Sequence, residues 1–179
     1  MKKVLVLALM LMAVCVQAEV ESNLLVNGSF ESDPYDAGWA AVMGNAREET
    51  GQVKTGAKAV IFDIADVGAW TFYGLEQKVN VTAGETYELD GFLEVVGSPD
   101  ILGKVEVLWL DVVGETISKD ETPDHKDGGW VYQDIAALTM VAPARAVNAA
   151  VRIVAGTTSD VAGWTAVVFD DISFGKLVR

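Results

Sequence analysis

Apolar and polar residues alternate along most of the chain after residue 18, and this two-residue period is typical of β-strands. In residues 87–95, for example, Tyr87, Leu89, Leu93 and Val95 fall on one side of the predicted strand. The same alternation, or a short continuous apolar run, recurs at regular intervals. The pattern predicts eight strands, at residues 24–30, 57–64, 70–79, 86–96, 104–110, 131–141, 146–154 and 165–174.

Turn-forming residues separate the predicted strands, as in Asp33-Pro34, the Gly97-Ser98-Pro99-Asp100 segment and Ala142-Pro143. Short strands with such turns are typical of a β-sandwich or barrel, and no helical period appears after residue 18. The most polar stretch, residues 118–129 (SKDETPDHKDGG), is predicted to be a long loop. Residues 19–179 are therefore predicted to form one all-β domain, a β-sandwich or barrel.

The first 18 residues have the pattern of a secretory signal peptide. Lys2 and Lys3 precede an apolar run at residues 4–16, and Ala18 supplies the small residue at the expected cleavage site. A membrane anchor is the alternative, but a bilayer needs about 20 apolar residues. A lipoprotein signal at Cys15 is a further alternative, although Val14 is bulkier than the small residue expected before a lipidated cysteine. Secretion to an extracellular location is predicted, with the periplasm and the cell surface as alternatives.

Removal of the signal peptide makes the chain strongly acidic. Loss of Lys2 and Lys3 from 13 basic residues leaves 11 against 26 acidic ones, a net charge of −15. This charge argues against nucleic acid and anionic lipid as partners, since both are bound by clustered Lys and Arg. The chain also loses Cys15, its only cysteine, so the folded domain has no disulfide. Neutral ligands and cations remain as plausible partners.

Six segments occur in the order found in one known superfamily. They are NLLVNGSFES, VKTGAKAV, LEQKVNVTAGETYELDGFLEV, VLWLDVVGE, GWVYQDIAALTMVAPARAVNAAVRI and VVFDDISF. Together they resemble the calcium-binding jelly-roll carbohydrate-binding modules of families four, nine and twenty-two, over residues 23–174. The resemblance implies a two-sheet antiparallel β-sandwich, a jelly roll, in which the first and last strands lie side by side. It also implies that a structural calcium ion lies near these strands. Its ligands would be Glu31, Asp170 and backbone oxygens in residues 55–58, Lys58 included.

The residues themselves are consistent with a calcium site. Alternation in the last predicted strand places Asp170 on the apolar face of Val168 and Ile172, where an isolated carboxylate would cost several kcal/mol. A second carboxylate, Glu31, would repel it unless a cation lay between them, and calcium accepts 6–8 oxygen ligands, backbone carbonyls included. Two alternatives stay open. In the first, Asp170 binds no metal and is solvated or paired with a Lys or Arg. In the second, Asp171 is the ligand and the strand register is shifted by one residue.

Four of the five tryptophans are interpreted as structural. Trp109 shares a face with Val105 and Val107, which indicates the core. Trp130 begins a predicted strand and resembles a structural position of the family. Trp39 and Trp164 each follow a glycine and are expected to close the ends of the sandwich.

Phe92 is the candidate sugar-stacking residue, because it lies on the polar face of its predicted strand between Asp90 and Glu94. Sugars bind to aromatic surfaces while polar side chains take their hydroxyl groups. Arg152 is expected on a neighbouring strand of the same face. Trp70, the remaining tryptophan, and the nearby Tyr73 are expected to form a loop wall of this sugar site. The alternative is that Phe92 packs beneath residues 118–129.

No enzymatic motif is present, and the only histidine, His125, lies in the most polar segment. The resulting hypothesis is a secreted, non-catalytic module that binds a poly- or oligosaccharide with a structural Ca²⁺. Such modules are appended to glycoside hydrolases, so a glycoside hydrolase or a cell-surface assembly is an expected partner. The alternative is a secreted or cell-surface structural or adhesion domain that binds no sugar.

Overall fold

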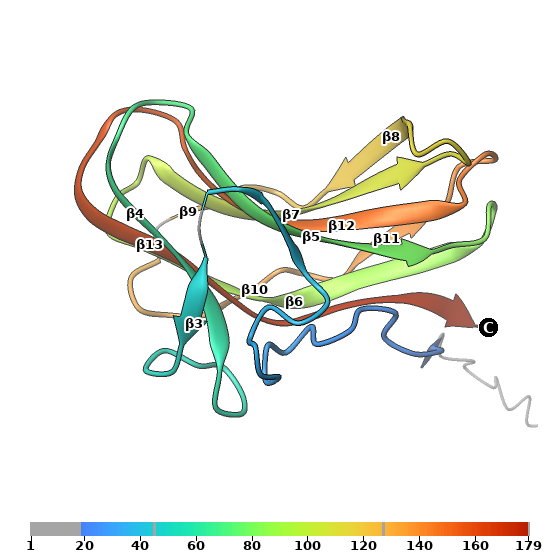
Figure 1. Cartoon of the computed structure of the whole chain (residues 1–179), viewed down its shortest axis with the longest axis horizontal. Coiled ribbons are helices and arrows are strands. Elements are labelled where there is room, and N and C mark those ends of the chain that lie inside the picture. The colour runs from blue at the N-terminus through green and yellow to red at the C-terminus, as the bar shows by residue number, and fades with distance from the viewer. Residues whose placement is uncertain (1–18, 45, 127, 179) are drawn as a thin grey trace, which may run out of the picture.

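All regular elements in the described residues are β-strands, and they form two antiparallel sheets stacked face to face (Figure 1). This computed structural model describes residues 19–44, 46–126 and 128–178, and the predicted signal peptide lies outside them. Within those ranges no helix is long and apolar enough to cross a membrane. The predicted all-β, two-sheet sandwich is confirmed.

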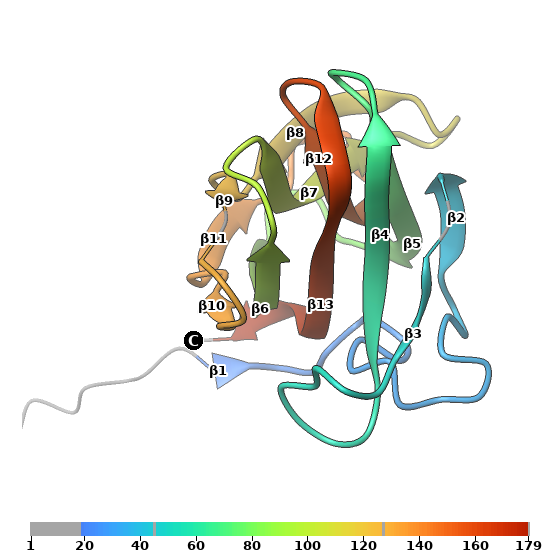
Figure 2. The same ribbon diagram turned by 90° about the vertical axis from the view of Figure 1, so that its left-hand side faces the viewer.

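The first sheet has seven strands. Its path is β10-β6-β13-β4-β3, with β1 paired to β13 and β11 paired to β6. Figure 2 shows β13 between β4 and β6. The strands are β1 (Glu19–Val20), β3 (Arg47–Glu49), β4 (Ala59–Val67), β6 (Thr86–Val96), β10 (Gln133–Asp134), β11 (Leu138–Val141) and β13 (Val161–Val178).

The second sheet has six strands. Its path is β2-β5-β12-β7-β8, and β9 pairs with β7. Antiparallel register joins β12 to both β5 and β7 along almost its whole length. The strands are β2 (Ala40–Met43), β5 (Phe72–Asn80), β7 (Ile101–Leu110), β8 (Thr116–Glu121), β9 (His125–Lys126) and β12 (Asn148–Thr157).

The core lies between the sheets and is filled by alternate residues of each strand. Leu89 and Leu93 of β6, Val151 and Ile153 of β12, and Trp109 of β7 are all buried, as the alternation predicts. Aromatic rings bridge the two layers, because Tyr87 stacks on Phe174 with ring centroids 5.3 Å apart and Trp109 lies beside both. The interpretation of Trp109 as a core residue is confirmed.

The predicted strand at residues 24–30 is wrong: the segment is a series of turns. Asn27 and Phe30 have φ values of 53° and 58°, which a strand does not contain. The Asn27 side chain stabilises this turn, accepting a hydrogen bond from the Ser32 N–H and donating one to the Tyr35 carbonyl. The extended conformation is thus replaced by local side-chain-to-backbone bonds.

The two ends of the chain nevertheless lie side by side (Figure 2). The Leu24 N–H donates to the Phe174 carbonyl, and the Ile172 N–H donates to the Gly28 carbonyl at 2.9 Å. Asn23 strengthens the contact, because its amide donates to the Ile172 carbonyl and accepts from the Phe174 N–H. Turns therefore dock the N-terminal segment on β13 after the short strand β1 ends.

The polar stretch at residues 118–129 is only partly a loop, because β8 and β9 run through it. Lys119 and Glu121 of β8 face charged residues of β7 across the edge of the sheet, so polarity there marks an exposed edge strand. Conversely, the strand predicted at residues 131–141 is interrupted. Ala136 has a φ of 57° and separates β10 from β11.

Candidate functional site

Charged side chains form a row across the outer face of the six-stranded sheet. Arg152 of β12 is the Cα partner of Glu76 on β5 and of Glu106 on β7, and Glu106 is the partner of Glu121 on β8. Cα partners project to the same side of a sheet. The "charged row" therefore consists of Glu76, Arg152, Glu106 and Glu121, one residue from each of four strands.

Ion pairs connect the charged row. The Arg152 Nη2 lies 2.6 Å from Glu76 Oε2, and the Arg152 Nη1 lies 3.8 Å from Glu106 Oε2. Lys104 bridges the last two carboxylates, with its Nζ 3.0 Å from Glu106 and 2.7 Å from Glu121. Hydrogen bonds from Lys104 and then Lys119 lower the pKa of Glu121 to about 2. Glu121 therefore remains ionised at neutral pH.

A hollow lies on each side of the charged row. The "Phe72 hollow", of about 210 Å³, is lined by Met43, Phe72, Val154, Lys104 and Glu106. Phe72 lies against Gly156, where any Cβ would overlap its ring. Aliphatic and aromatic carbon thus lies next to an ammonium group and a carboxylate.

The second hollow, of about 180 Å³, has the small residue Ala150 of β12 in its lining. The other lining residues are Glu76, Lys78, Leu108, Leu110, Gly114, Thr116 and Arg152. This "Ala150 hollow" shares Arg152 and Glu76 with the charged row. The Phe72 hollow combines a mainly apolar lining with fixed hydrogen-bonding groups, the combination that small-molecule sites use for orientation and specificity, whereas the Ala150 hollow is mainly polar.

The predicted sugar platform is wrong as a single site, because its members lie on different sheets. Phe92, Asp90 and Glu94 belong to β6 of the seven-stranded sheet, whereas Arg152 belongs to β12 of the other. Phe92 is also only partly exposed, with the Lys54 Nζ 4.4 Å from its ring centroid. The strands within residues 118–129, which were the alternative cover, belong to the six-stranded sheet.

Trp70 and Tyr73, the predicted loop wall, also lie in different surroundings. Trp70 is 68% exposed in the β4–β5 connection, where its N–H donates to the Thr157 carbonyl. Tyr73 packs against the core, and any Cβ on Gly44 would overlap its ring. Of the six predicted residues, only Arg152 lies in the charged row, and Trp70 lies two residues before Phe72 in the chain.

Glu94 is fully buried on the outer side of the seven-stranded sheet, and neither of its carboxyl oxygens has a hydrogen-bond partner. Tyr132, whose hydroxyl donates to the Gln52 carbonyl at 3.0 Å, packs on the small apolar cluster over this sheet. Burial, and then the charge of Glu49, raise the pKa of Glu94. Glu94 is therefore predisposed to carry a proton.

Glu31 and Asp170 are held by one loop, residues 54–58. The N–H groups of Lys54 and Thr55 donate to Asp170 Oδ2 at 2.9 and 3.1 Å. Those of Ala57 and Lys58 donate to Glu31 Oε1 at 2.9 and 3.0 Å. The structure thus brings the predicted metal ligands to the same loop, which presents N–H groups to both carboxylates.

The two carboxylates differ in burial. Asp170 is fully buried, and burial raises its pKa to about 6 despite the hydrogen bonds that it accepts. Glu31 is exposed, and the hydrogen bonds from Lys58 and then Ala57 lower its pKa. In the described residues no three His, Cys, Asp or Glu side chains gather closely enough to hold a metal by themselves. A metal here would need backbone oxygens.

The prediction that Asp170 and Ile172 share one face of the strand is wrong, because β13 has a bulge between them. The register of β13 against β6 shifts between Asp170 and Ser173, and Asp171 has a φ of 50°. As a result Asp170 follows Val168 on the outer side, whereas Ile172 packs in the core. Asp171, the register-shifted alternative, accepts a hydrogen bond from the Thr55 hydroxyl at 2.6 Å.

Lys58 contributes its backbone N–H to Glu31, while its ammonium group points elsewhere. The Nζ lies 3.0 Å from Glu48 Oε2 and 3.4 Å from the Ser32 carbonyl oxygen. The side chain therefore joins β3 to the turn that follows Glu31.

Sequence reasoning missed an aromatic pair. Trp130 and Trp164, interpreted as structural, are 50% and 49% exposed, and their rings stack with centroids 5.8 Å apart. Trp164 is thus half exposed, whereas Trp39 is buried against Phe30. The one signal in the sequence was that each of these tryptophans follows a glycine, Gly129 or Gly163. In the structure both glycines have a positive φ.

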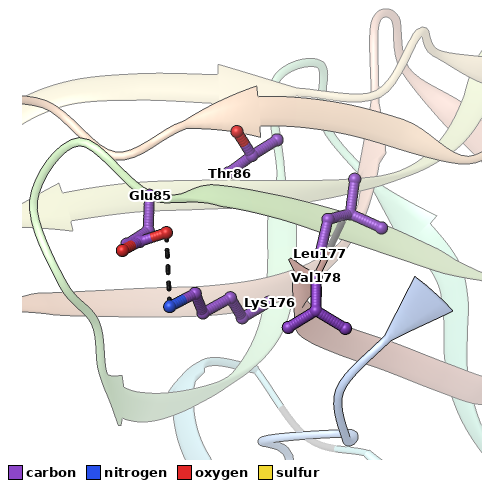
Figure 3. Close-up of a pocket in the computed structure, with 5 residues that line it drawn as sticks. All are labelled: Glu85, Thr86, Lys176, Leu177 and Val178. Carbon is purple, nitrogen blue, oxygen red and sulfur yellow. Dashed lines mark ion pairs between the residues drawn. The ribbon is translucent and has the colours of Figure 1, made fainter. Parts of the chain in front are cut away.

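A further hollow, of about 370 Å³, lies where β13 ends beside the start of β6 (Figure 3). Lys176 points towards Glu85 there, and their charged groups are 3.2 Å apart. Thr86, Leu177 and Val178 complete the lining. Because no aromatic ring lines it, this hollow has fewer recognition groups than the Phe72 hollow.

The sequence matches no protein-family model and no curated protein. The carbohydrate-binding module TmCBM61, solved in complex with beta-1,4-galactotriose, has a similar structure, with a TM-score of 0.60 and 15% identity over 87% of this chain and 99% of that chain. The CBM22-1 xylan-binding domain of Paenibacillus barcinonensis Xyn10C gives 0.61 and 16% over 90% and 97%.

The chain has the jelly-roll fold of carbohydrate-binding modules. The resemblance inferred from its six sequence segments is thereby confirmed for the fold. The enzymatically active domain of tailspike protein 4 from bacteriophage CBA120 is also similar, with a TM-score of 0.67 and 13% identity over 86% of this chain. This chain spans 21% of the length of that tailspike chain.

Proposed function

We propose that this protein is a secreted, non-catalytic module that binds a poly- or oligosaccharide on the outer face of its six-stranded sheet. The observation that carries the proposal is the Phe72 hollow, in which Phe72 and Val154 form an apolar surface beside Lys104 and Glu106. A sugar ring presents C–H groups on its faces and hydroxyl groups at its rim. The apolar surface would receive the face, and the charged groups would bind the hydroxyls.

The charged row supports a site for a chain rather than for a single sugar. It separates the Phe72 hollow from the Ala150 hollow, and Arg152 and Glu106 each line one of them. A saccharide that crosses the row would contact both hollows. The neighbouring structures described above include modules whose complexes or names specify galactotriose and xylan, which supports this class of ligand for the fold.

A calcium ion at the predicted position remains part of the proposal. Glu31, Asp170 and backbone oxygens of residues 55–58 would hold it, and both carboxylates already lie on that loop. When bound, the ion would supply positive charge that links the N-terminal turns to β13. The N–H groups of the loop already offset part of the negative charge of the two carboxylates. The ion is therefore expected to strengthen a contact between the loop and both carboxylates that exists without it.

A structural or adhesion domain without sugar binding is the second candidate. The strands of the six-stranded sheet contain one tryptophan and one tyrosine, Trp109 and Tyr73, and both pack against the core. The charged row is also internally paired, which leaves fewer free donors for hydroxyl groups. These two features favour a surface that stabilises the sheet.

Retention on polysaccharides decides between the two. The protein should be retarded in native gels that contain soluble xylan or β-1,4-galactan, and Phe72→Ala should weaken retention about 2- to 12-fold, from loss of an aromatic contact of about 0.5–1.5 kcal/mol. Val112→Ala, on the exposed β7–β8 turn, is the matched control. Equal retention of the wild type and Phe72→Ala would place any sugar elsewhere, and no retention on a broad glycan panel would favour the structural domain.

A further inference from the structure

Two exposed indole rings stack on the seven-stranded sheet, away from the Phe72 hollow. Trp164 lies near the start of β13, where its Cα partner is Ala65 of β4, and Trp130 lies between β9 and β10. Their ring planes make an angle of 24° and about half of each side chain is exposed. Val131, beside Trp130, is 62% exposed. Adjacent exposed aromatic residues of this kind mark a binding surface more often than a scattered surface residue does.

Trp164 is held in place by a chain of hydrogen bonds. Its Nε1 donates to Asp63 Oδ1 at 2.9 Å, and the same oxygen accepts from Arg47 Nη2 at 3.1 Å. Hydrogen bonding by Arg47 lowers the pKa of Asp63, which favours the carboxylate that orients the indole. A ligand that stacks on a ring already fixed in this way loses little additional side-chain entropy on binding.

The backbone also positions the pair. Gly129 and Gly163 have φ values of 69° and 85°, a region that other residues seldom adopt, and each immediately precedes its tryptophan. Two separate turns therefore direct two indoles to one place on the surface. This arrangement is specific to the tertiary structure, since the residues are 34 positions apart in the sequence.

The surroundings favour a neutral saccharide as the occupant. Nucleic acid and anionic membranes are disfavoured by the acidic chain, and two copies with a formal charge of −13 each would repel one another. Arg47, whose side chain is 53% exposed, and Asp63 place charged hydrogen-bonding groups beside the rings. Aromatic faces with adjacent charged donors and acceptors match the C–H faces and hydroxyl rim of a sugar.

We propose that Trp130 and Trp164, with Arg47 and Asp63 beside them, form a second carbohydrate-binding platform on the seven-stranded sheet. The inference rests on the proposed function, because it assumes that saccharides are the ligands of this domain. It adds a site on the sheet opposite the charged row. Two sites on opposite sheets would let one domain contact two polysaccharide chains, or two parts of one branched chain.

The test compares variants of the two sites in native gels that contain soluble xylan or β-1,4-galactan. Trp130→Ala and Trp164→Ala should each weaken retention about 2- to 12-fold, while Phe72→Ala reports on the other sheet. Trp164→Phe, which keeps a ring without the Nε1 donor, should recover part of the loss. Melting temperatures of all variants establish that each is folded, and Val112→Ala serves as the control.

The outcomes separate the two proposals. Normal retention of both tryptophan variants, with loss in Phe72→Ala, overturns the second platform and leaves the proposed site standing. Loss only in the tryptophan variants supports the platform and contradicts the Phe72 site. No retention of the wild type overturns both. A change in oligomeric state of Trp164→Ala in sedimentation velocity would also overturn the platform, because the occupant would then be a second copy of the chain.

Discussion

Arg152 and Glu76 lie on adjacent strands with the guanidinium Nη2 2.6 Å from a carboxylate oxygen, and they form one end of the charged row. Glu76 and Glu106 are each only 12% exposed, so the positive charge between them offsets their repulsion. Arg152→Ala should therefore destabilise the domain by about 1–2 kcal/mol, less than the 3–5 kcal/mol typical of a fully buried pair. Denaturant unfolding measures the loss.

Arg152→Lys is the control for that prediction. It keeps a positive charge but cannot bridge two carboxylates with a planar fork, so part of the stability should be recovered. If Arg152→Ala unfolds at the same denaturant concentration as the wild type, the charged row does not stabilise the sheet.

Chelation should reveal the proposed calcium ion. EDTA should lower the melting temperature, and calcium should restore it better than magnesium, which requires a tighter octahedral shell. A ligand bound only by the folded state stabilises it by about 2.7 kcal/mol at a hundredfold excess over Kd. Asp170→Ala or Glu31→Ala should remove most of this calcium response, and Asp171→Ala should leave much of it. A melting curve unaffected by both EDTA and calcium would contradict the site.

Gly56→Ala tests the loop at residues 54–58, whose N–H groups bind the carboxylates of Glu31 and Asp170. Gly56 has a φ of 68°, and an added Cβ would overlap the Glu31 carboxylate. The substitution should cost more than the roughly 1–2 kcal/mol of left-handed strain alone, because Glu31 must move. Gly84→Ala is a matched control, since Gly84 has a φ of 80° and no atom near the added Cβ. Equal losses in calorimetry would show that the Glu31 contact contributes nothing.

Glu94→Gln should make the domain more stable at neutral and alkaline pH. Because burial raises the pKa of Glu94, the folded state holds its proton more tightly than the unfolded state. The resulting stability is full at acidic pH, below the ordinary glutamate pKa, and is lost as pH rises through the raised value. Gln cannot ionise, so it avoids a cost of about 1–3 kcal/mol for a buried, unpaired charged group.

The measurement is the melting temperature of the wild type and Glu94→Gln from pH 4 to pH 8. Their difference should grow with pH, with Glu115→Gln on the exposed β7–β8 turn as the control. A difference independent of pH would show that Glu94 does not titrate in this range.

The alternation of residue types determined the strands and the residues that face the core. The pattern places Leu89, Leu93 and Trp109 in the interior correctly because side chains on a strand alternate between two faces, a strictly local rule. The same alternation gave two wrong predictions. The segment around Asn27 forms turns instead of a strand, and the bulge at Asp171 reverses the face of Ile172. Both depend on a positive φ that an apolar pattern does not encode.

Only the tertiary structure decided which residues share a surface. Phe92 and Arg152 each face outward as the alternation predicts, yet β6 and β12 lie in different sheets, so they form no common site. Trp130 and Trp164 meet through two glycine turns, and Glu31 meets Asp170 through a loop distant from both in sequence. Strand periodicity specifies the direction of a side chain, whereas the choice of partner strand depends on long-range packing. The fold could therefore be predicted from the sequence, and the grouping of its candidate site residues could not.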